Sequence, residues 1–478
     1  MVNHQHVQVL VIGGGPAGST AATLLAREGI DVMLVERDMF PRYHIGESLL
    51  PSVLEILELT GALEKVEAFG FQHKPGGHIE WGSQQWDLLF QDLPRQYGYS
   101  FQVIRSEFDK ILLDHAASQG VKVLQGVAVQ QILFDPDQTE RPTGVTLSEA
   151  ANSQQSWDIT FDMLIDASGR AGLMANRYLR NRHYHEAFKN VALWGYWMDT
   201  ARLPGDKAGA IATISIPEGW VWAIPLHDAT MSVGVVMHKE TFKAKRANQS
   251  LETIYRTGLE QSPTICTLLA TGELVSDEIR VETDYSYAAT QFAGPGYFII
   301  GDAACFIDPL LSSGVHLAMF SGLLAAASIA SAVRNEVSMA EATSFFEESY
   351  RSAYLRVLVF LTAFYNLYDG RDSIFWTARQ LSYHNETSDT TLKSAFTRLM
   401  SGVEDLHDVQ YASQTGRHLI LEGMSKQVED FLAERPTNNT GGQTMGKFGG
   451  VRTMAQSPEH AVQGMYIVKE PHLCIKRV

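Results

Sequence analysis

The chain has 478 residues, 45% of them hydrophobic, which is enough to bury a large core and to form more than one structural unit. Its 54 acidic residues outnumber its 38 basic residues, and the net charge of −16 argues against a nucleic-acid-binding surface. The three cysteines are scattered and form no CxxC pair, so neither a disulfide framework nor a zinc cluster is expected. No signal peptide is visible at the start, so we expect a cytoplasmic protein.

The N-terminal segment has the pattern of a strand, a glycine-rich loop, a helix and a second strand. An apolar run at 7–12 enters GGGPAG at 13–18, and a second apolar run at 32–35 ends in an acidic residue. The glycines allow a tight turn close to a diphosphate, the helix N-terminus binds the anion, and the acid accepts hydrogen bonds from a ribose. The segment therefore predicts an adenine dinucleotide held by Gly13, Gly15, Ala17, Gly18, Glu36 and Arg37.

Two later segments decide between FAD and a nicotinamide dinucleotide. LIDASGR at 164–170 carries Asp166 at a strand end, and GYFIIGDAACFIDPLLSSGVHLAM at 296–319 carries Asp302 before a long helix. Both resemble the flavin sites of the FAD-dependent aromatic hydroxylase superfamily, and the sequence has no second GxGxxG. The resemblance implies a Rossmann-like α/β fold in which Asp166, Asp302 and Arg105, the last at a strand–helix junction, approach FAD.

The stretch GWVWAIPL at 219–226 places Trp220 and Trp222 two residues apart. Taken alone it predicts a core strand, because alternate residues of a strand share one face. In the middle of a flavoprotein, however, W-x-W-x-I-P resembles the fingerprint of the flavin-dependent halogenases. Three further stretches resemble motifs of that family, and they carry Ser48 (HIGESLLP), Lys74 (FQHKPGG), and Ser313 with Gly314 (DPLLSSGV). Within that family, these motifs resemble those of the phenol- and pyrrole-type aryl halogenases.

The resemblance implies a reaction in which reduced FAD and oxygen give a flavin C4a-hydroperoxide, which a chloride or bromide ion attacks to yield hypohalous acid. Ser313 and Gly314, at a helix start, would hold the halide through backbone amides. Trp220 and Trp222 would keep the organic substrate away from the flavin, and Lys74 would relay the halogen to it. Because no second dinucleotide site is visible, reduced FAD is expected from a separate flavin reductase.

One position departs from the tryptophan-type branch of the family. Leu311 stands where that branch has a glutamate that assists attack by the arene. A substrate activated by its own ionisable hydroxyl needs no such carboxylate, so we expect a phenolic or similarly electron-rich ring rather than free tryptophan. The sequence leaves open whether this ring is free or tethered to a carrier protein.

Alternating runs and composition suggest how the chain is divided. The expected parts are a discontinuous FAD-binding domain (1–75, 99–190 and 284–333), an antiparallel substrate-side sheet (76–98 and 191–283), and a helical C-terminal region (334–478) with a flexible segment (435–450). The apolar run at 317–333 is short for a membrane span and predicts a buried helix packed on a sheet. No metal is expected, because no further ligands stand out beside His183-Tyr184-His185-Glu186.

Two other functions share parts of this pattern. An FAD-dependent aromatic monooxygenase or a geranylgeranyl-reductase-like enzyme would share the fold, Glu36 and Asp302. Neither accounts for Lys74 together with the two tryptophans. A flavin-binding scaffold or sensor without turnover is a rival of a different class, against which the intact lysine and halide motifs speak.

Overall fold

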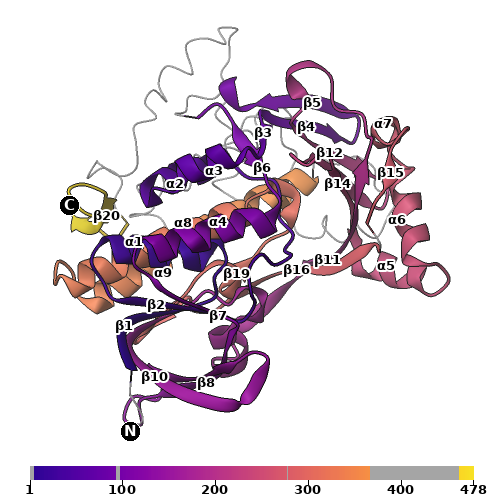
Figure 1. Ribbon diagram of the computed structural model, residues 1–478. Coiled ribbons are helices and arrows are strands. Elements are labelled where there is room, and N and C mark those ends of the chain that lie inside the picture. Colours follow the sequence, from indigo (N-terminus) through magenta and orange to yellow (C-terminus); the bar gives the residue numbers. More distant parts are fainter. Residues whose placement is uncertain (1–4, 93–96, 277, 367–461) are drawn as a thin grey trace.

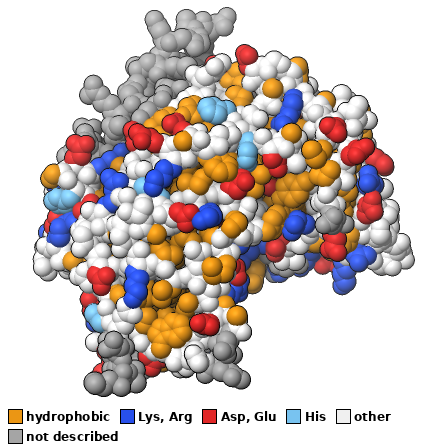
Figure 2. Space-filling model, in the orientation of Figure 1, with side chains coloured by type: hydrophobic (Ala, Val, Ile, Leu, Met, Phe, Trp, Pro, Cys, Tyr) orange, Lys and Arg blue, Asp and Glu red, His pale blue; other side chains and the backbone are white. Residues whose placement is uncertain are grey.

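The computed structural model describes residues 5–92, 97–276, 278–366 and 462–478. Two large sheets organise these residues, one at the lower left of Figure 1 and one at the right, and helices lie above the first. On the face drawn in Figure 2, Lys and Arg side chains are interspersed with Asp and Glu, and no continuous basic surface covers the described residues seen there.

The first sheet carries the nucleotide-binding pattern. Its strand order is β17 (Ala293–Gly294), β18 (Tyr297–Ile299), β10 (Asn152–Asp166), β1 (Gln5–Ile12), β2 (Val32–Glu36), β7 (Lys122–Gln125), with β9 (Pro142–Glu149) paired to β10 and β8 (Val127–Phe134) paired to β9. Neighbouring strands from β18 to β7 are parallel, and β2 is fully buried, as expected for a strand covered on both faces. The carboxyl ends of β1, β2, β10 and β18 therefore meet at one edge, where such folds bind their ligands.

Small residues let the helices pack closely over this sheet. α1 (Pro16–Arg27) packs on α4 (Arg105–Ser118) and on α8 (Gly314–Val333), and α8 also packs on α9 (Met339–Asn366). A Cβ atom at Gly322 would lie 2.7 Å from the carbonyl oxygen of Ala17, so glycine is what allows α1 and α8 to approach. α8 is long and apolar enough to cross a membrane, but 89% of that stretch is buried inside the protein, as in a core helix. Its main partners are helices rather than the sheet that the sequence suggested.

The second sheet is mainly antiparallel. Its order is β19 (Cys305–Phe306), β16 (Arg280–Ala289), β11 (Arg182–Met198), β14 (Met231–His238), β13 (Gly219–Pro225), β12 (Ile211–Ile216), β4 (Gly76–Trp81), β5 (Gln84–Leu89), with β15 (Glu273–Leu274) beside β11. The pair β12–β4 is parallel. Helices α5 (Lys239–Arg246), α6 (Leu251–Leu259) and α7 (Pro263–Leu268) lie at its outer side (Figure 1). The sheet thus occupies the ranges assigned to the substrate side, but β11 begins earlier and β16 ends later than those ranges.

Shorter elements join these parts. α2 (Pro51–Thr60) and α3 (Leu63–Phe69) precede a two-stranded sheet of β3 (Gln72–Lys74) and β6 (Ser100–Gln102). Near the C-terminus, β20 (Met465–Val468) and β21 (Cys474–Arg477) form a hairpin in a region that the sequence suggested to be helical. The segment 435–450 lies outside the described residues. Short helical turns are η1 (Phe90–Asp92), η2 (Gly169–Ala171), η3 (Leu173–Tyr178), η4 (Gly205–Lys207), η5 (Gly301–Ala303) and η6 (Pro309–Leu311).

Candidate active site

A cavity of about 570 Å³ is lined by residues from both large sheets. It extends from the loops at the carboxyl edge of the first sheet to the inner face of β11 and β13 in the second. The residues that we expected at the site and that line this cavity are Gly13, Gly15, Ala17, Glu36, Arg37, Ser48, Arg105, Asp302, Gly314, Trp220 and Trp222. Gly18, Lys74, Asp166 and Ser313 lie outside its lining.

The glycine loop after β1 has no space for a side chain at two of its glycine positions. Gly13 has φ +108°, and a Cβ atom there would lie 2.2 Å from the Ala167 carbonyl oxygen. A Cβ atom at Gly18 would lie 2.0 Å from the Gly13 carbonyl oxygen. No side chain caps the N-terminus of α1, which leaves this end of the helix to an anion. Glu36 Oε2 accepts the Gly14 amide at 2.7 Å, so the carboxylate is fixed beside the loop.

Arg42 is a cavity residue that the sequence analysis missed. Its Nη2 atom lies 3.4 Å from the position that a Cβ atom of Gly15 would take, and its Nη1 atom pairs with Asp109 at 3.2 Å. A guanidinium at this point is suited to a diphosphate on the glycine loop. No motif signals it, because a lone arginine in a loop has no characteristic spacing.

The two carboxylates predicted to contact FAD occupy different positions. Asp166 Oδ1 accepts the Ser168 amide at 3.0 Å and Oδ2 accepts the Met174 amide at 2.7 Å, so this side chain shapes the loop that lines the cavity. Asp302 lines the cavity itself. Burial raises the pKa of Asp302, and the Arg170 guanidinium opposes this effect.

Arg105 is 5% exposed, and its hydrogen bonds inside the protein fix its orientation. Its Nε and Nη2 atoms donate to both oxygens of Asp109 at 2.8 and 2.9 Å, and its Nη1 atom donates to the Ile45 carbonyl at 2.8 Å. The side chain thus holds the turn at residues 45–46 against the cavity while its charge is compensated by Asp109.

A hydrogen-bonded chain of polar side chains runs along the cavity wall, where Trp194, Tyr43 and Glu47 line the cavity and Tyr196 links the last two. Trp194 Nε1 donates to the Tyr43 hydroxyl at 2.7 Å, the Tyr43 and Tyr196 hydroxyls are 2.9 Å apart, and the Tyr196 hydroxyl donates to Glu47 Oε1 at 2.7 Å. Burial raises the pKa of Glu47 to about 7, against the opposing effect of Ser232 and Tyr196. Glu47, Tyr43 and Tyr196 also line a second cavity of about 240 Å³. A carboxyl group with this pKa is partly protonated near neutral pH, and the sequence analysis did not single out Glu47.

Lys74 lies at the end of β3 and its side chain is 0% exposed. Residues 72–74 pair with β6. Lys74 Nζ donates to the Leu49 carbonyl at 2.9 Å and lies 5.4 Å from the centre of the Phe90 ring. Among the described residues no acidic side chain forms an ion pair with it. Burial lowers the pKa of Lys74 to about 7, so much of this amine is neutral at physiological pH.

The halide loop, defined here as residues 309–314, comprises η6 and the turn into the start of α8. Ser312 and Gly314 line the cavity, and a Cβ atom at Gly314 would meet only open space. Ser313 is 3% exposed, and its hydroxyl has no hydrogen-bond partner among the described residues. Buried hydroxyls are normally paired, so this donor is available to a small ligand at the helix start. Leu311 is 1% exposed and places apolar surface in the same loop.

β13 places three large side chains against the cavity. Trp220, Trp222 and Ile224 alternate along the strand, all three line the cavity, and they are 2%, 5% and 6% exposed. The two indoles lie 5.8 Å apart between ring centres. A Cβ atom at Gly234 of β14 would lie 2.1 Å from the Trp222 ring, so the absence of a side chain there makes room for the indole. These rings form a wall on one side of the cavity.

Comparison with known proteins identifies the family. The family model described as tryptophan halogenase matches residues 8–92 and 86–415. A tryptophan 2-halogenase of Chondromyces crocatus is 46% identical over 495 residues, covering 98% of this chain and 94% of the relative. The flavin-dependent halogenase armH2 of Armillaria mellea is 42% identical over 373 residues, covering 75% of this chain and 72% of the relative. This chain belongs to the flavin-dependent halogenases.

Solved structures of flavin-dependent halogenases support the same family assignment for this chain. The myxobacterial chondrochloren halogenase CndH superposes with a TM-score of 0.74 at 36% identity, covering 83% of this chain and 90% of that one. The flavin-dependent halogenase CmlS gives a TM-score of 0.73 at 33% identity, with 84% and 72% covered. The predicted family, the FAD-binding α/β fold, and the use of FAD and a halide are thereby confirmed.

The cavity of the halogenase fits FAD. The glycine loop and the uncapped start of α1 suit a diphosphate, and Glu36 lies beside them. At the other end, the Ser48 hydroxyl and the Trp220 indole N–H are buried without a hydrogen-bond partner among the described residues, and both residues line the cavity. A bound molecule with polar groups would satisfy such atoms.

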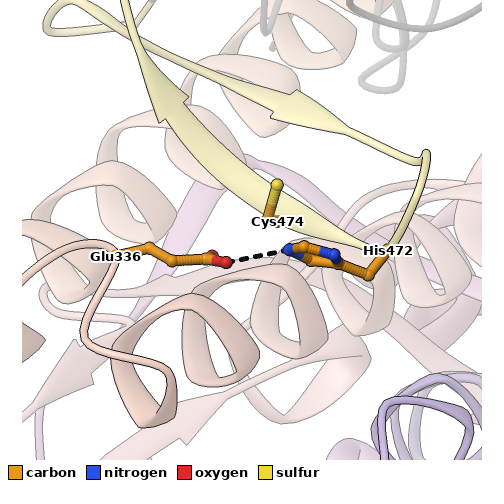
Figure 3. A group of neighbouring side chains, drawn as sticks. All are labelled: Glu336, His472 and Cys474. Atoms are coloured by element: carbon orange, nitrogen blue, oxygen red, sulfur yellow. Dashed lines mark hydrogen bonds and ion pairs between the residues drawn. The ribbon is translucent and has the colours of Figure 1, made fainter.

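A cluster of potential metal ligands lies elsewhere, where the C-terminal hairpin meets the end of α8. Figure 3 shows Glu336 pointing toward His472, with Cys474 beside them. The Glu336 carboxylate accepts from His472 Nε2 at 2.9 Å and from Arg334 Nε at 3.1 Å, and Arg334 also pairs with Glu28 at 2.9 Å. Because a guanidinium already neutralises the carboxylate, we interpret the cluster as an ion-pair network that fastens the hairpin.

Proposed function

We propose that the halogenase transfers an electrophilic halogen to an electron-rich aromatic ring, with Lys74 carrying or activating the halogen on its way. The buried amine is the observation that carries this proposal, because its pKa of about 7 makes it partly neutral and it lies outside the flavin cavity. A neutral amine can donate a hydrogen bond to hypohalous acid. It can also attack the halogen, forming an N–halogen bond and releasing water, and then pass the halogen to a carbon that loses its proton.

FAD, once reduced and supplied with oxygen, provides the two-electron oxidant for the halide. We assign Gly13, Gly15, Ala17 and Gly18 to the diphosphate, Glu36 with the neighbouring Arg37 to the adenosine end, and Asp302 to the flavin end. Asp166 and Arg105 support this site through the loops that they hold, and Ser48 offers a hydroxyl at the cavity wall.

Ser313 and Gly314 bind the halide in this proposal. The unpaired Ser313 hydroxyl and the backbone amides at the start of α8 are donors that carry no full charge and lie in a protected place. Such donors suit chloride and bromide alike.

Oxidation of a halide to hypohalous acid consumes one proton. Glu47 is suited to supply it, because its carboxyl group is partly protonated near pH 7 and lines the cavity. The hydroxyls of Tyr196 and Tyr43 connect this carboxyl group to the second cavity, through which the proton can be replaced. The wall of Trp220 and Trp222 keeps the organic substrate from the flavin while the smaller hypohalous acid travels to Lys74.

The apolar Leu311 supports a phenolic substrate, since a phenol activates its own ring. An indole is the second candidate, because the relative that is 46% identical is named a tryptophan 2-halogenase. Incubation with a phenol panel, free tryptophan and carrier-tethered forms of both, followed by mass spectrometry, separates these substrates. Efficient chlorination of free tryptophan, with no phenol turned over, would overturn the argument from Leu311.

Further features of the proposal concern supply and organisation. A separate flavin reductase delivers reduced FAD, and the enzyme acts in the cytoplasm. The first sheet with α1, α4 and α8 forms the FAD-binding domain, and the second sheet forms the substrate side, with β11 and β16 extending past the boundaries at 191 and 283 that the sequence suggested. The purified protein should oxidise NADPH slowly when alone. Fast, substrate-stimulated NADPH consumption would instead favour the aromatic monooxygenase, and the absence of any oxygen-dependent flavin oxidation would favour a scaffold.

The decisive experiment uses two variants of one residue. Lys74→Ala should bind FAD and consume oxygen as before, but halogenated product should be lost and hypohalous acid or peroxide should escape into solution. Lys74→Arg should fail in the same way, because a guanidinium does not readily lose its proton. Substantial halogenation by either variant would remove Lys74 from the reaction.

A further inference from the structure

A buried carboxylate holds the halide loop from behind. Asp308 is 0% exposed and directly precedes this loop. Its Oδ1 atom accepts the Leu310 amide at 3.1 Å and the Tyr365 hydroxyl at 2.9 Å, and its Oδ2 atom accepts the side-chain amide of Asn190. Its own backbone amide donates to the Ser286 hydroxyl at 3.1 Å. One side chain thus ties the start of the loop to β11 and α9, and its backbone ties it to β16.

The loop needs such an anchor because its backbone is strained. Ser312 has φ +54°, a left-handed conformation that is unfavourable for a residue with a Cβ atom. The Ser312 amide donates to the Pro309 carbonyl at 3.0 Å, which closes the turn, and the Ser313 carbonyl accepts the Leu317 amide at 2.9 Å, which begins α8. The halide donors follow this turn, so their position depends on how firmly the turn is held at its start.

Tyr365 brings a remote part of the chain to this anchor. It lies 57 residues after Asp308, is 2% exposed, and packs its ring against Trp81 of β4 at 5.8 Å and Phe188 of β11 at 6.0 Å between ring centres. The ring is held by packing on the second sheet, so its hydroxyl is directed at Asp308 by the folded core. Other aromatic residues of α9, such as Phe346 and Tyr350, pack against Phe298 and Phe292 instead.

We propose that Asp308, held by Tyr365 and Asn190, is the positioning residue that sets the halide affinity and halide selectivity of this enzyme. It does so by fixing the backbone of the halide loop before the anion arrives, and this inference rests on the proposed halide site. Asp308 does not line the flavin cavity, so it acts on the halide only through the loop.

Removing one anchor should weaken halide binding while leaving the chemistry intact. Tyr365→Phe keeps the ring and its packing and deletes only the hydroxyl that donates to Asp308. Loss of one hydrogen bond to a charged acceptor should raise the KM for chloride roughly tenfold, with kcat at saturating chloride and the KM for the arene unchanged. A looser loop should discriminate less against the larger anion, so the ratio of bromination to chlorination should rise.

Asp308→Asn separates positioning from simple charge. An amide of nearly the same size cannot accept from all the donors that surround the carboxylate, so the positioning role predicts weaker chloride binding. If the negative charge of Asp308 acted on the halide directly, its removal would strengthen chloride binding. A lower KM for chloride in Asp308→Asn would therefore overturn the proposal.

The matched control is Tyr354→Phe on the same helix. The Tyr354 hydroxyl is also buried but is hydrogen-bonded to His185 rather than to the halide loop. This variant should have the chloride KM and the halide preference of the unchanged enzyme. A tenfold rise in the KM for chloride in Tyr354→Phe as well would show that the loss of any hydroxyl from α9 has this effect. It would contradict a specific role for Asp308.

A titration without turnover provides the second readout. The FAD-loaded protein is titrated with chloride and then bromide, and the change in flavin absorbance gives a Kd for each halide. Tyr365→Phe should raise the chloride Kd in proportion to its KM. If Tyr365→Phe has the same chloride Kd and the same chloride KM as the unchanged enzyme, the positioning role of Asp308 is overturned, while the proposed function stands. Failure of the unchanged enzyme to halogenate would instead contradict the proposed function.

Discussion

Replacing Lys74 with methionine should make the protein more stable while it abolishes halogenation. The unfolded chain holds this lysine at its usual pKa of 10.5, and the folded chain at about 7. At pH 7 this difference costs the fold about 4 kcal/mol, because folding releases about half a proton from the amine and buries the charge that remains. Methionine has a similar length and no charge, so it avoids this cost, but it leaves the Leu49 carbonyl without its donor. The lost hydrogen bond offsets about 1–2 kcal/mol of this stabilisation, so the free energy of unfolding should rise by about 2–3 kcal/mol in Lys74→Met.

The pH dependence distinguishes this explanation from better packing. Since the folded pKa of Lys74 is lowered, the unfolded chain binds more protons between pH 7 and 10.5, and the unchanged protein gains stability as the pH rises. The advantage of Lys74→Met should therefore shrink by about 1 kcal/mol between pH 7 and 8 and by about 1.3 kcal/mol between pH 8 and 9, as measured by urea unfolding at pH 7, 8 and 9. Lys122→Met, at an exposed lysine of β7, should show no such trend. An advantage that stays constant with pH, or a loss of stability at pH 7, would refute the buried-amine argument.

Three further changes test other parts of the site. Glu47→Gln should lower halogenation and flatten the alkaline limb of the pH–rate profile. Above pH 7 this variant should also be more stable than the unchanged protein, because the raised pKa of Glu47 makes ionisation of its buried carboxyl group unfavourable. Gly234→Ala should push the Trp222 indole out of place, so oxygen is consumed with less halogenated product and more free hypohalous acid. The control is Gly77→Ala, whose added carbon would lie 3.5 Å from Ile211, an ordinary contact distance. In this variant oxygen consumption and product formation should stay coupled. Glu336→Gln should speed hydrogen exchange in β20 and β21 without changing FAD affinity, and equal exchange rates would argue against the ion-pair network.

The nucleotide end of the site could be predicted from sequence because its chemistry is local. Gly13, Gly18 and Glu36 lie within one strand–loop–helix–strand unit, and their spacing alone defines the turn and the acid beside it. The alternation of Trp220 and Trp222 likewise predicted one shared face, since the period of a strand is two residues.

The remaining contacts depend on tertiary structure that no local pattern encodes. Tyr196 reaches Glu47 across 149 residues, and Tyr365 reaches Asp308 across 57. For Glu47 a signal was present, because it lies in the HIGESLLP stretch beside Ser48, but its raised pKa follows only from burial in the fold. Asp166 shows the converse, since its place at a strand end was predicted while its two backbone partners were not.

Strand β13 belongs to two hydrophobic cores at once. Trp220, Trp222 and Ile224 pack into the core shared with the flavin-binding sheet, and Val221 and Ala223 pack into a separate core beneath α6 and α7. A slip of one residue along β14 would exchange these two sets. Enlarging the passage for bulkier arenes by trimming an indole would therefore leave a void whose relaxation is limited by the core behind the strand. Engineering for a wider range of substrates should therefore begin in the halide loop or around Lys74 and leave β13 unchanged.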